Sequence, residues 1–191
     1  MNEARVNSGA DHLLMLKVRD GDVGQLGALF ERYHGMLFNF FLRMSGSRSA
    51  SEDLVQEVFF RMLKYRHTYR DESNFVTWMY KIARHVRFDD LRKKRNEVML
   101  EEEEKAGQVS HYPLPGEKLE KRQEVELLRN ALARIAPDRR ELLILSRFQL
   151  LKYEEIAEIL GCQVGAVKVR VFRAVRELRA AFFELVGEKA S

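Results

Sequence analysis

A chemically distinctive surface lies in the last helical segment of the sequence. From residue 164 onward, apolar side chains recur at intervals of three and four, which gathers them on one face of a helix. They are Val164, Val167, Val171, Ala174 and Leu178. The opposite face carries Gly165, Val169, Phe172, Arg173 and Arg176, flanked by Lys168, Arg170 and Arg179. Cations can contact phosphates or guanine edges and apolar groups can contact thymine methyls, so this face suits a DNA major groove.

A short helix and a tight turn precede this basic helix. Residues 155–160 repeat apolar groups with helical spacing, and Gly161-Cys162-Gln163 separates them from Val164. Glycine can supply the left-handed backbone that such a turn needs. The pattern predicts a helix-turn-helix, in which the second helix contacts DNA. The alternative is a helical hairpin with a solvated basic face.

A second basic concentration lies in the first half of the chain. Residues 81–95 hold seven basic side chains against two acidic ones, and they follow the aromatic residues Tyr65, Tyr69, Trp78 and Tyr80. Basic groups that track phosphates beside aromatics that stack on bases are typical of a surface for single-stranded nucleic acid. Most of these aromatics could instead be core, and we expect this of Trp78.

Composition narrows the class of protein. The chain has 191 residues, 46% of them hydrophobic, with 33 basic and 29 acidic side chains and three prolines. These values predict a helical protein with one or two buried cores. The single cysteine, Cys162, excludes an internal disulfide. The first residues lack a signal-peptide pattern and no apolar run approaches about 18 residues, so we expect a cytoplasmic protein without membrane insertion.

The elements that position these surfaces form two helical blocks. In the first, residues 11–96, we predict helices over residues 13–19, 23–44, 51–66 and 75–95. Ser49 and Glu52 have capping-box spacing before the third helix, and Ser73 or Asn74 can cap the fourth. An apolar stripe on the fourth helix predicts its buried face. The stripe consists of Phe75, Met79, Ile82, Ala83 and Val86.

A linker and a second block follow. Residues 97–120 hold seven glutamates against two lysines, together with prolines and glycines that interrupt the periodicity. They predict an acidic flexible linker, with a simple solvated charge run as the alternative. In residues 121–186 we predict helices over residues 123–135, 138–149, 153–160 and 164–185, with Asp138 and Glu141 at capping-box spacing after Pro137.

Three motifs, taken in order, resemble the extracytoplasmic-function (ECF) sigma factors of bacterial RNA polymerase. They are EDLVQEVFFRML, FVTWMYKIARHVRFDDLRKK and YEEIAEILGCQVGAVKVRVFRAVRELR, and the resemblance covers about residues 11–186. It implies an all-α protein with two small domains, a region 2 type bundle at 11–96 and a region 4 type helix-turn-helix at 121–186. The first would bind the polymerase and open the −10 element, and the second would read the −35 element.

The resemblance also implies roles for individual residues. The positions that match the polymerase-binding segment are Asp53, Gln56, Glu57 and Phe59. The positions implied to act at the −10 element are Arg61, Tyr69, Asn74, Trp78, Lys81, Arg84, His85, Asp89 and Arg92. At the −35 element they are Gly165, Lys168, Val169, Arg170, Phe172, Arg173 and Arg176. His85 stands where the family usually has asparagine, and Val169 where it has serine, so the family does not imply the promoter sequence.

Partners follow from the same resemblance. It implies binding to the clamp helices and flap of the polymerase core, to promoter DNA and to an anti-sigma factor. The protein would be cytoplasmic, either free or held at the membrane by the anti-sigma factor. The acidic linker resembles the family connector that follows the active cleft and RNA exit path.

Two other classes of function would need features that this sequence lacks. An enzyme would need convergent catalytic groups, yet the five histidines have no metal-ligand spacing and no phosphate-binding loop is present, so we expect no enzyme, cofactor or metal. A stand-alone helix-turn-helix regulator would need a ligand pocket or a receiver-type carboxylate cluster in the first block. The sequence predicts neither.

Overall fold

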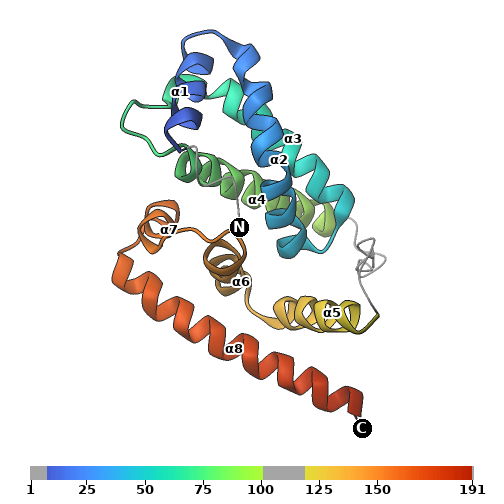
Figure 1. Cartoon of the computed structure of the whole chain (residues 1–191). Helices are drawn as coiled ribbons and strands as arrows, with labels where there is room; N and C mark the ends of the chain where they lie inside the picture. Colours follow the sequence, from blue (N-terminus) through green and yellow to red (C-terminus); the bar gives the residue numbers. More distant parts are fainter. Residues whose placement is uncertain (1–7, 101–118, 191) are drawn as a thin grey trace. The chain divides into compact units, whose positions relative to one another are not determined.

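The computed structural model describes residues 8–100 and 119–190, and within these ranges every secondary-structure element is helical (Figure 1). The prediction of an all-helical protein is therefore confirmed. Residues 101–118, the greater part of the predicted acidic linker, lie outside the described ranges. The chain divides into two compact units. Among the described residues, the N-terminal unit comprises residues 8–41 and 49–100, and the C-terminal unit comprises residues 42–48 and 119–190.

The N-terminal unit is built on four α-helices. They are α1 (Ser8–Arg19), α2 (Leu26–Ser45), α3 (Arg48–Lys64) and α4 (Phe75–Leu100), with 3-10 turns at Val23–Gln25 and Arg66–Thr68. The predicted stripe on α4 is buried, since each of its five side chains is at most 9% exposed. It packs in a core with fully buried side chains from the other three helices, including Met15, Leu37 and Met62.

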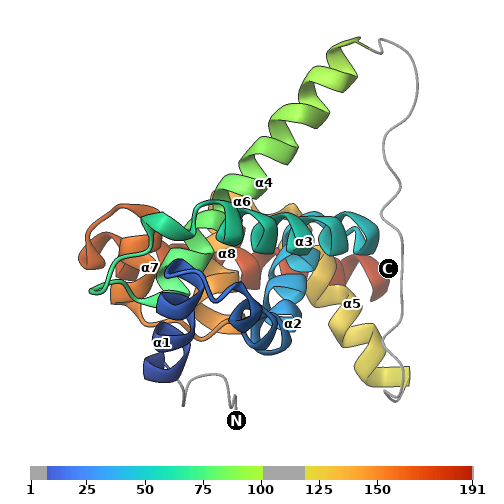
Figure 2. The same cartoon turned by 90° about the horizontal axis from the view of Figure 1, so that it is seen from above.

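Helix α4 is longer than the sequence pattern indicated. We predicted an end near residue 95, but the helix continues to Leu100. No proline or glycine occurs between residues 75 and 106, so the loss of apolar periodicity marks the end of packing and not the end of the helix. Residues 91–96 are exposed, and Figure 2 shows this part of α4 projecting beyond the other helices of the unit.

A buried carboxylate fastens α1 to α2. Asp11 is 1% exposed, and the Tyr33 hydroxyl donates a hydrogen bond of 2.6 Å to its Oδ2 atom, while Arg32 pairs with Oδ1. Burial and the contact with Asp11 raise the pKa of Tyr33 well above its usual value, so the phenol stays a donor. The buried charge is thereby both paired and hydrogen-bonded, which a carboxylate in a core requires.

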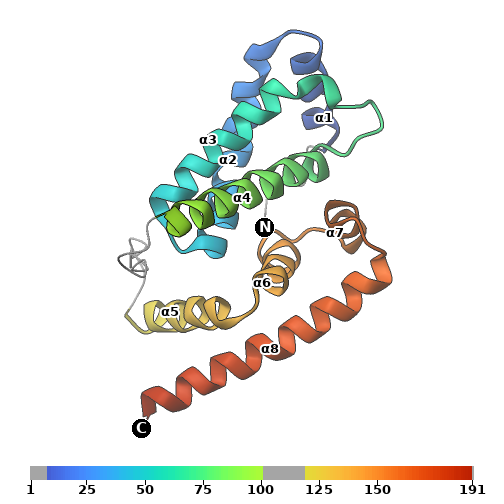
Figure 3. The same ribbon diagram turned by 180° about the vertical axis from the view of Figure 1, so that it is seen from behind.

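Helix α8 organises the C-terminal unit. This unit contains α5 (Leu119–Arg134), α6 (Pro137–Leu143), α7 (Tyr153–Leu160) and α8 (Val164–Ala190). Helix α8 contacts each of the other three, and Figure 3 shows it running along one side of them. A core cluster of Leu132, Ile135, Leu143 and Ala174 joins α5, α6 and α8. The last helix therefore serves as the support on which the shorter helices pack.

The chain leaves α6 through a π-helical turn that the sequence did not indicate. We predicted one α-helix over residues 138–149, but Ile144–Phe148 forms a π-turn, closed by a 2.9 Å bond from the Gln149 amide to the Ile144 carbonyl. Leu150 then has φ 54°, a left-handed conformation that a leucine rarely adopts. Because no glycine or proline stands at residues 144–150, this break could not be predicted from the residue types.

The helix starts differ from two predicted capping boxes. Helix α3 begins at Arg48, so Ser49 lies inside its first turn and does not precede it. Helix α6 has Ala136 at its N-cap, makes no side-chain cap bond, and begins with Pro137. Proline is favoured there because the first helical amides have no partner within the helix. Both boxes were therefore wrong, although the helices themselves were predicted.

Two buried tyrosines provide a matched test of this core. The Tyr33 hydroxyl bonds to a buried carboxylate, whereas among the described residues the buried Tyr80 hydroxyl has no hydrogen-bond partner. We expect Tyr33→Phe to lower the free energy of unfolding by about 1–3 kcal/mol, because it strips a donor from a buried charge. Tyr80→Phe should be neutral or stabilising. Denaturant unfolding followed by the fluorescence of Trp78, the single tryptophan, measures both. Equal losses would contradict the assignment.

Candidate nucleic-acid interface

The turn between α7 and α8 is set by a left-handed glycine. Gly161 has φ 64° and ψ 40° at the C-cap of α7, and the Cys162 amide donates to the Ala157 carbonyl at 3.0 Å. At the other end of α7, the Lys152 amide donates to the Glu155 carboxylate at 2.7 Å. A lysine ammonium has no lone pair to return the bond, so only half of a capping box forms. The predicted helix-turn-helix is present.

The apolar face of α8 is buried as predicted. Val167, Val171 and Ala174 are at most 1% exposed, while Val164 and Leu178 are partly buried. These residues occupy one face because three- and four-residue steps return to nearly the same angle around a helix. The face opposite them must therefore point away from the core.

The outward face of α8 combines exposed apolar groups with cations. Val169 is 50% exposed and Phe172 is 64% exposed, and the guanidinium of Arg176 lies 5.9 Å from the centre of the Phe172 ring. The remaining predicted members of this face are also exposed, namely Gly165, Lys168, Arg170, Arg173 and Arg176. Large apolar groups at such exposure indicate a contact surface, and the surrounding cations favour a nucleic acid.

Helix α6 adds a basic residue that the sequence pattern did not reveal. Arg139 lines an open recess together with Arg173, Arg176 and Glu177 of α8. Glu177 forms an ion pair with Arg139, and this hydrogen bond raises the pKa of Arg139. Arg139 lies 38 positions from Glu177 in the chain, so only the packing of α6 on α8 brings it beside the outward face of α8. The recess therefore gathers three guanidinium groups around one carboxylate beside the outward face of α8.

In the N-terminal unit, three of the predicted site residues pair with one another. Arg61 of α3 donates from Nε to Glu57 at 2.6 Å and from Nη1 to Asp89 of α4 at 2.6 Å. The hydrogen bond from Arg61 is the main cause of a lowered pKa at Asp89. Arg92 lies at the edge of this network, 3.9 Å from Asp89. The cluster fixes α3 against α4 and leaves His85 exposed beside it.

The segment from Tyr69 to Asn74 forms a loop that begins with a buried ring. Tyr69 is 1% exposed, so its side chain lies in the core and not on the outer surface as a base-stacking group would. The half-buried Trp78 contacts it edge-on, with ring centres 5.1 Å apart. Asn74 caps α4, because its side-chain oxygen accepts the Thr77 amide at 3.2 Å. Of the two predicted caps, Asn74 is thus the one that bonds an amide of the first turn.

The basic run on α4 is partly covered and partly open. Lys81 and Arg84 are half-buried, and the Arg84 guanidinium lies 5.4 Å from the ring centre of Phe88, which is 49% exposed. Arg92 and its neighbours to Arg95 are exposed. The surface therefore offers an aromatic ring beside cations, which suits stacking on an unpaired base.

A third surface lies on α3. Asp53 and Gln56 are exposed and one turn apart, and Glu57 is partly covered by its bond to Arg61. Phe59 is only 6% exposed and packs edge-on against Phe30, with ring centres 4.9 Å apart. The neighbouring Phe60, which was not among the predicted site residues, is 59% exposed. Phe59 and Phe60 are adjacent, so the rotation of α3 about its axis decides which of the two rings is buried and which is exposed.

Two other kinds of feature are absent from the described residues. In residues 8–100 and 119–190, no three His, Cys, Asp or Glu side chains gather in a way that could hold a metal ion. No helix of the described chain is long and apolar enough to span a membrane.

The comparisons with known proteins agree with this geometry. The family model of sigma-70 region 2 matches residues 29–97, and that of sigma-70 region 4 matches residues 125–178. The RNA polymerase sigma factor YlaC of Bacillus subtilis is 31% identical over 79% of this chain and 88% of its own length. The ECF RNA polymerase sigma factor EcfG of Rhodopseudomonas palustris is 35% identical over 75% of this chain and 77% of its own.

A solved structure shares the arrangement of helices. It is the sigma factor RpoE from Bartonella quintana in complex with the anti-sigma factor NepR, with a TM-score of 0.70 and 26% identity, covering 81% of this chain and 94% of that one. Fold and surfaces define a two-unit helical DNA-binding protein. The chain belongs to the ECF-type sigma-70 family of RNA polymerase sigma factors, which are non-catalytic subunits that act in transcription initiation.

Gly161, in the turn, and Gly165, just after it, should respond oppositely to substitution by alanine. An added Cβ meets nothing within 4 Å at Gly161 or Gly165, so only backbone conformation distinguishes them. We expect Gly161→Ala to destabilise the C-terminal unit by about 1 kcal/mol, because alanine resists a positive φ. Gly165→Ala, inside α8, should stabilise it by about 0.5 kcal/mol. Amide hydrogen exchange at Val167 and Val171 measures both. Destabilisation by both variants would argue against a purely conformational effect.

Proposed function

We propose that the two units divide promoter recognition between them. The C-terminal unit reads the −35 element with the outward face of α8, and the N-terminal unit captures and opens the −10 element with the loop at residues 69–74 and the basic side of α4. The observation that carries this proposal is the exposed face of α8, where Val169 and Phe172 stand among cations opposite a buried face. A soluble helix gains nothing from such a face unless a partner covers it.

The match of the N-terminal unit to sigma-70 region 2 separates this proposal from a stand-alone regulator. A regulator would carry a sensor domain there. Instead α3 presents Asp53 and Gln56 on its surface, where a carboxylate and an amide can make charge-assisted bonds to a basic partner helix. We assign this surface, with Glu57, to the clamp helices of the polymerase core, and the C-terminal unit to the polymerase flap. Phe60 is the exposed aromatic that can join the α3 surface.

Regulation by an anti-sigma factor is part of the proposal. The RpoE chain from Bartonella quintana was solved with its anti-sigma factor NepR, and this chain shares its fold over 94% of that chain's length. We infer that a partner of the same kind covers the polymerase-binding or DNA-binding surfaces of this protein. The protein would then work in the cytoplasm, free or held by that partner at the membrane.

Arg173 should carry sequence-specific binding energy at the −35 element. For Arg173→Ala in the holoenzyme, we expect a loss of about 1–3 kcal/mol on a promoter with its native −35 element, as for removal of an arginine that bonds a base edge. Binding to the same promoter with a scrambled −35 element should change little. Fluorescence anisotropy at fixed salt measures both.

The matched control is Arg147→Ala, which removes one exposed cation from the same unit outside α8. It should weaken binding to the native and to the scrambled promoter slightly and equally. If Arg173→Ala also weakened binding to both promoter DNAs equally, Arg173 would contact a phosphate and the base-reading role would be wrong.

Assembly with the polymerase core should depend on the exposed groups of α3. We expect the double variant Asp53→Ala/Gln56→Ala to lose co-elution with core enzyme on gel filtration while its thermal midpoint stays unchanged, because both side chains are exposed. Glu31→Ala, an exposed acid on α2, is the control and should co-elute. Normal co-elution of the double variant would refute the assignment of this surface.

A further inference from the structure

Helix α1 has no role in the surfaces described so far. It ends at Arg19, ten residues before the region 2 match begins at residue 29. Its buried side chains, Met15 and Val18, attach it to the core, and Asp11 fastens it to Tyr33 of α2. This attachment makes α1 a fixed support inside the unit. Its polar side chains extend from that support to the loop at residues 69–74.

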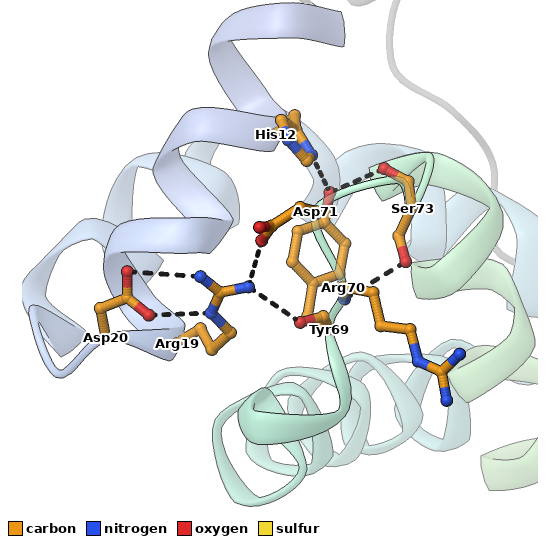
Figure 4. A network of polar contacts seen from close by, with 7 residues as sticks. All are labelled: His12, Arg19, Asp20, Tyr69, Arg70, Asp71 and Ser73. Atoms are coloured by element: carbon orange, nitrogen blue, oxygen red, sulfur yellow. Dashed lines mark hydrogen bonds and ion pairs between the residues drawn. The ribbon is translucent and has the colours of Figure 1, made fainter.

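The last residue of α1 holds the first half of that loop. Arg19 donates from Nη1 to the Asp71 carboxylate at 2.5 Å and to the Tyr69 carbonyl at 3.4 Å. Its Nε donates to the neighbouring Asp20 at 2.8 Å, which orients the guanidinium plane (Figure 4). One planar group thus bridges α1 to both the backbone and a side chain of the loop, 50 and 52 positions away.

His12, one turn before the buried Met15, holds the ring at the start of the loop. Its Nδ1 lies 2.8 Å from the hydroxyl oxygen of Tyr69, and that hydroxyl donates to the Ser73 carbonyl at 3.2 Å. The Ser73 hydroxyl accepts the Arg70 amide at 3.3 Å. Bonds to Ser73 therefore close the loop on itself, and Arg19 and His12 tie it to α1.

This arrangement separates the supporting groups from the exposed ones. Tyr69 is buried, while Arg70, Asp71 and Glu72 are exposed, and Figure 4 shows the Arg70 side chain directed away from the network. A loop that is already in its binding conformation does not lose further conformational entropy when it takes a ligand. Holding the loop thus favours binding without any contact between the support and the ligand.

We propose that Arg19 is a positioning residue for −10 recognition: it keeps the loop at residues 69–74 in the conformation that accepts an unpaired base, and it acts through Asp71 and the Tyr69 carbonyl without touching DNA. This inference rests on the proposed function of the loop. An ion pair with an exposed partner adds little to global stability, so loss of Arg19 changes the loop and leaves the fold intact.

The test uses holoenzyme with the full-length protein. The probes are a single-stranded oligonucleotide with the non-template −10 sequence of a promoter at which the wild type initiates, and a duplex with its −35 element. We expect Arg19→Ala to bind the single strand about fivefold more weakly, the factor that loss of an exposed ion pair gives, and to bind the −35 duplex unchanged. Amide exchange at residues 70–73 should become faster. Lys17→Ala, an exposed cation of the same helix, should match the wild type in all three measurements.

Arg19→Lys separates positioning from simple charge. It keeps the positive charge but cannot span Asp20, Asp71 and the Tyr69 carbonyl with one rigid fork, so we expect it to behave like Arg19→Ala. Full single-strand affinity in Arg19→Lys, with loss only in Arg19→Ala, would show attraction between a cation and DNA and would overturn the inference. If Arg19→Ala lowers the thermal midpoint, the single-strand affinity of Arg19→Lys alone tests the positioning role.

Failure of this inference is distinguishable from failure of the proposed function. If wild-type holoenzyme shows no preference for the −10 strand over a scrambled strand, the role of the N-terminal unit in −10 capture is wrong. If the wild type shows the preference and Arg19→Ala retains it with unchanged exchange at residues 70–73, −10 capture stands and the positioning role is wrong.

Discussion

Burial of one face of α8 is the constraint on which the exposed basic face of this helix depends. Val167, Val171 and Ala174 are at most 1% exposed, and they pack where α5, α6 and α7 meet this helix. When a helix buries these positions, Val169 and Phe172 remain exposed, because they lie on the opposite side of the helix. Burial of the apolar face is favourable, and it fixes the rotation of α8 about its axis. The basic side chains of the outward face are therefore directed toward solvent. Gly161 completes the arrangement by turning the chain from α7 into α8 with a left-handed backbone.

In the N-terminal unit, polar contacts fix the elements that carry the exposed groups. A buried Asp11 fixes α1 to α2, and α1 in turn holds the loop that begins at Tyr69. The Arg61 network fixes α3 to α4. In both units, the exposed groups thus belong to elements that are fixed by packing or by hydrogen bonds. Rigid presentation matters for a protein that must bind DNA through several weak contacts, because each mobile contact would cost entropy on binding.

Much of this arrangement was readable from the sequence, because helical periodicity reports burial directly. The α7 bounds, the start of α8, the buried stripe on α4 and the exposed face of α8 were all predicted. The features that were missed depend on contacts between distant positions or on local choices that several residues can satisfy. Arg139 reaches the recess only through packing of α6 on α8, and Arg19 reaches the loop only through packing of α1. The choice between Phe59 and Phe60 and the π-turn after α6 left no compositional signal.

Run-off transcription tests the division of promoter recognition most directly. Purified bacterial core RNA polymerase and this protein would transcribe a library of genomic fragments, and the 5′ ends of the transcripts would be sequenced. We expect start sites that require the protein and that share two upstream motifs, one for each unit, at a constant spacing. Protein-dependent starts without a shared −35 motif would contradict the role of α8, and binding to DNA without any protein-dependent initiation would contradict the account as a whole.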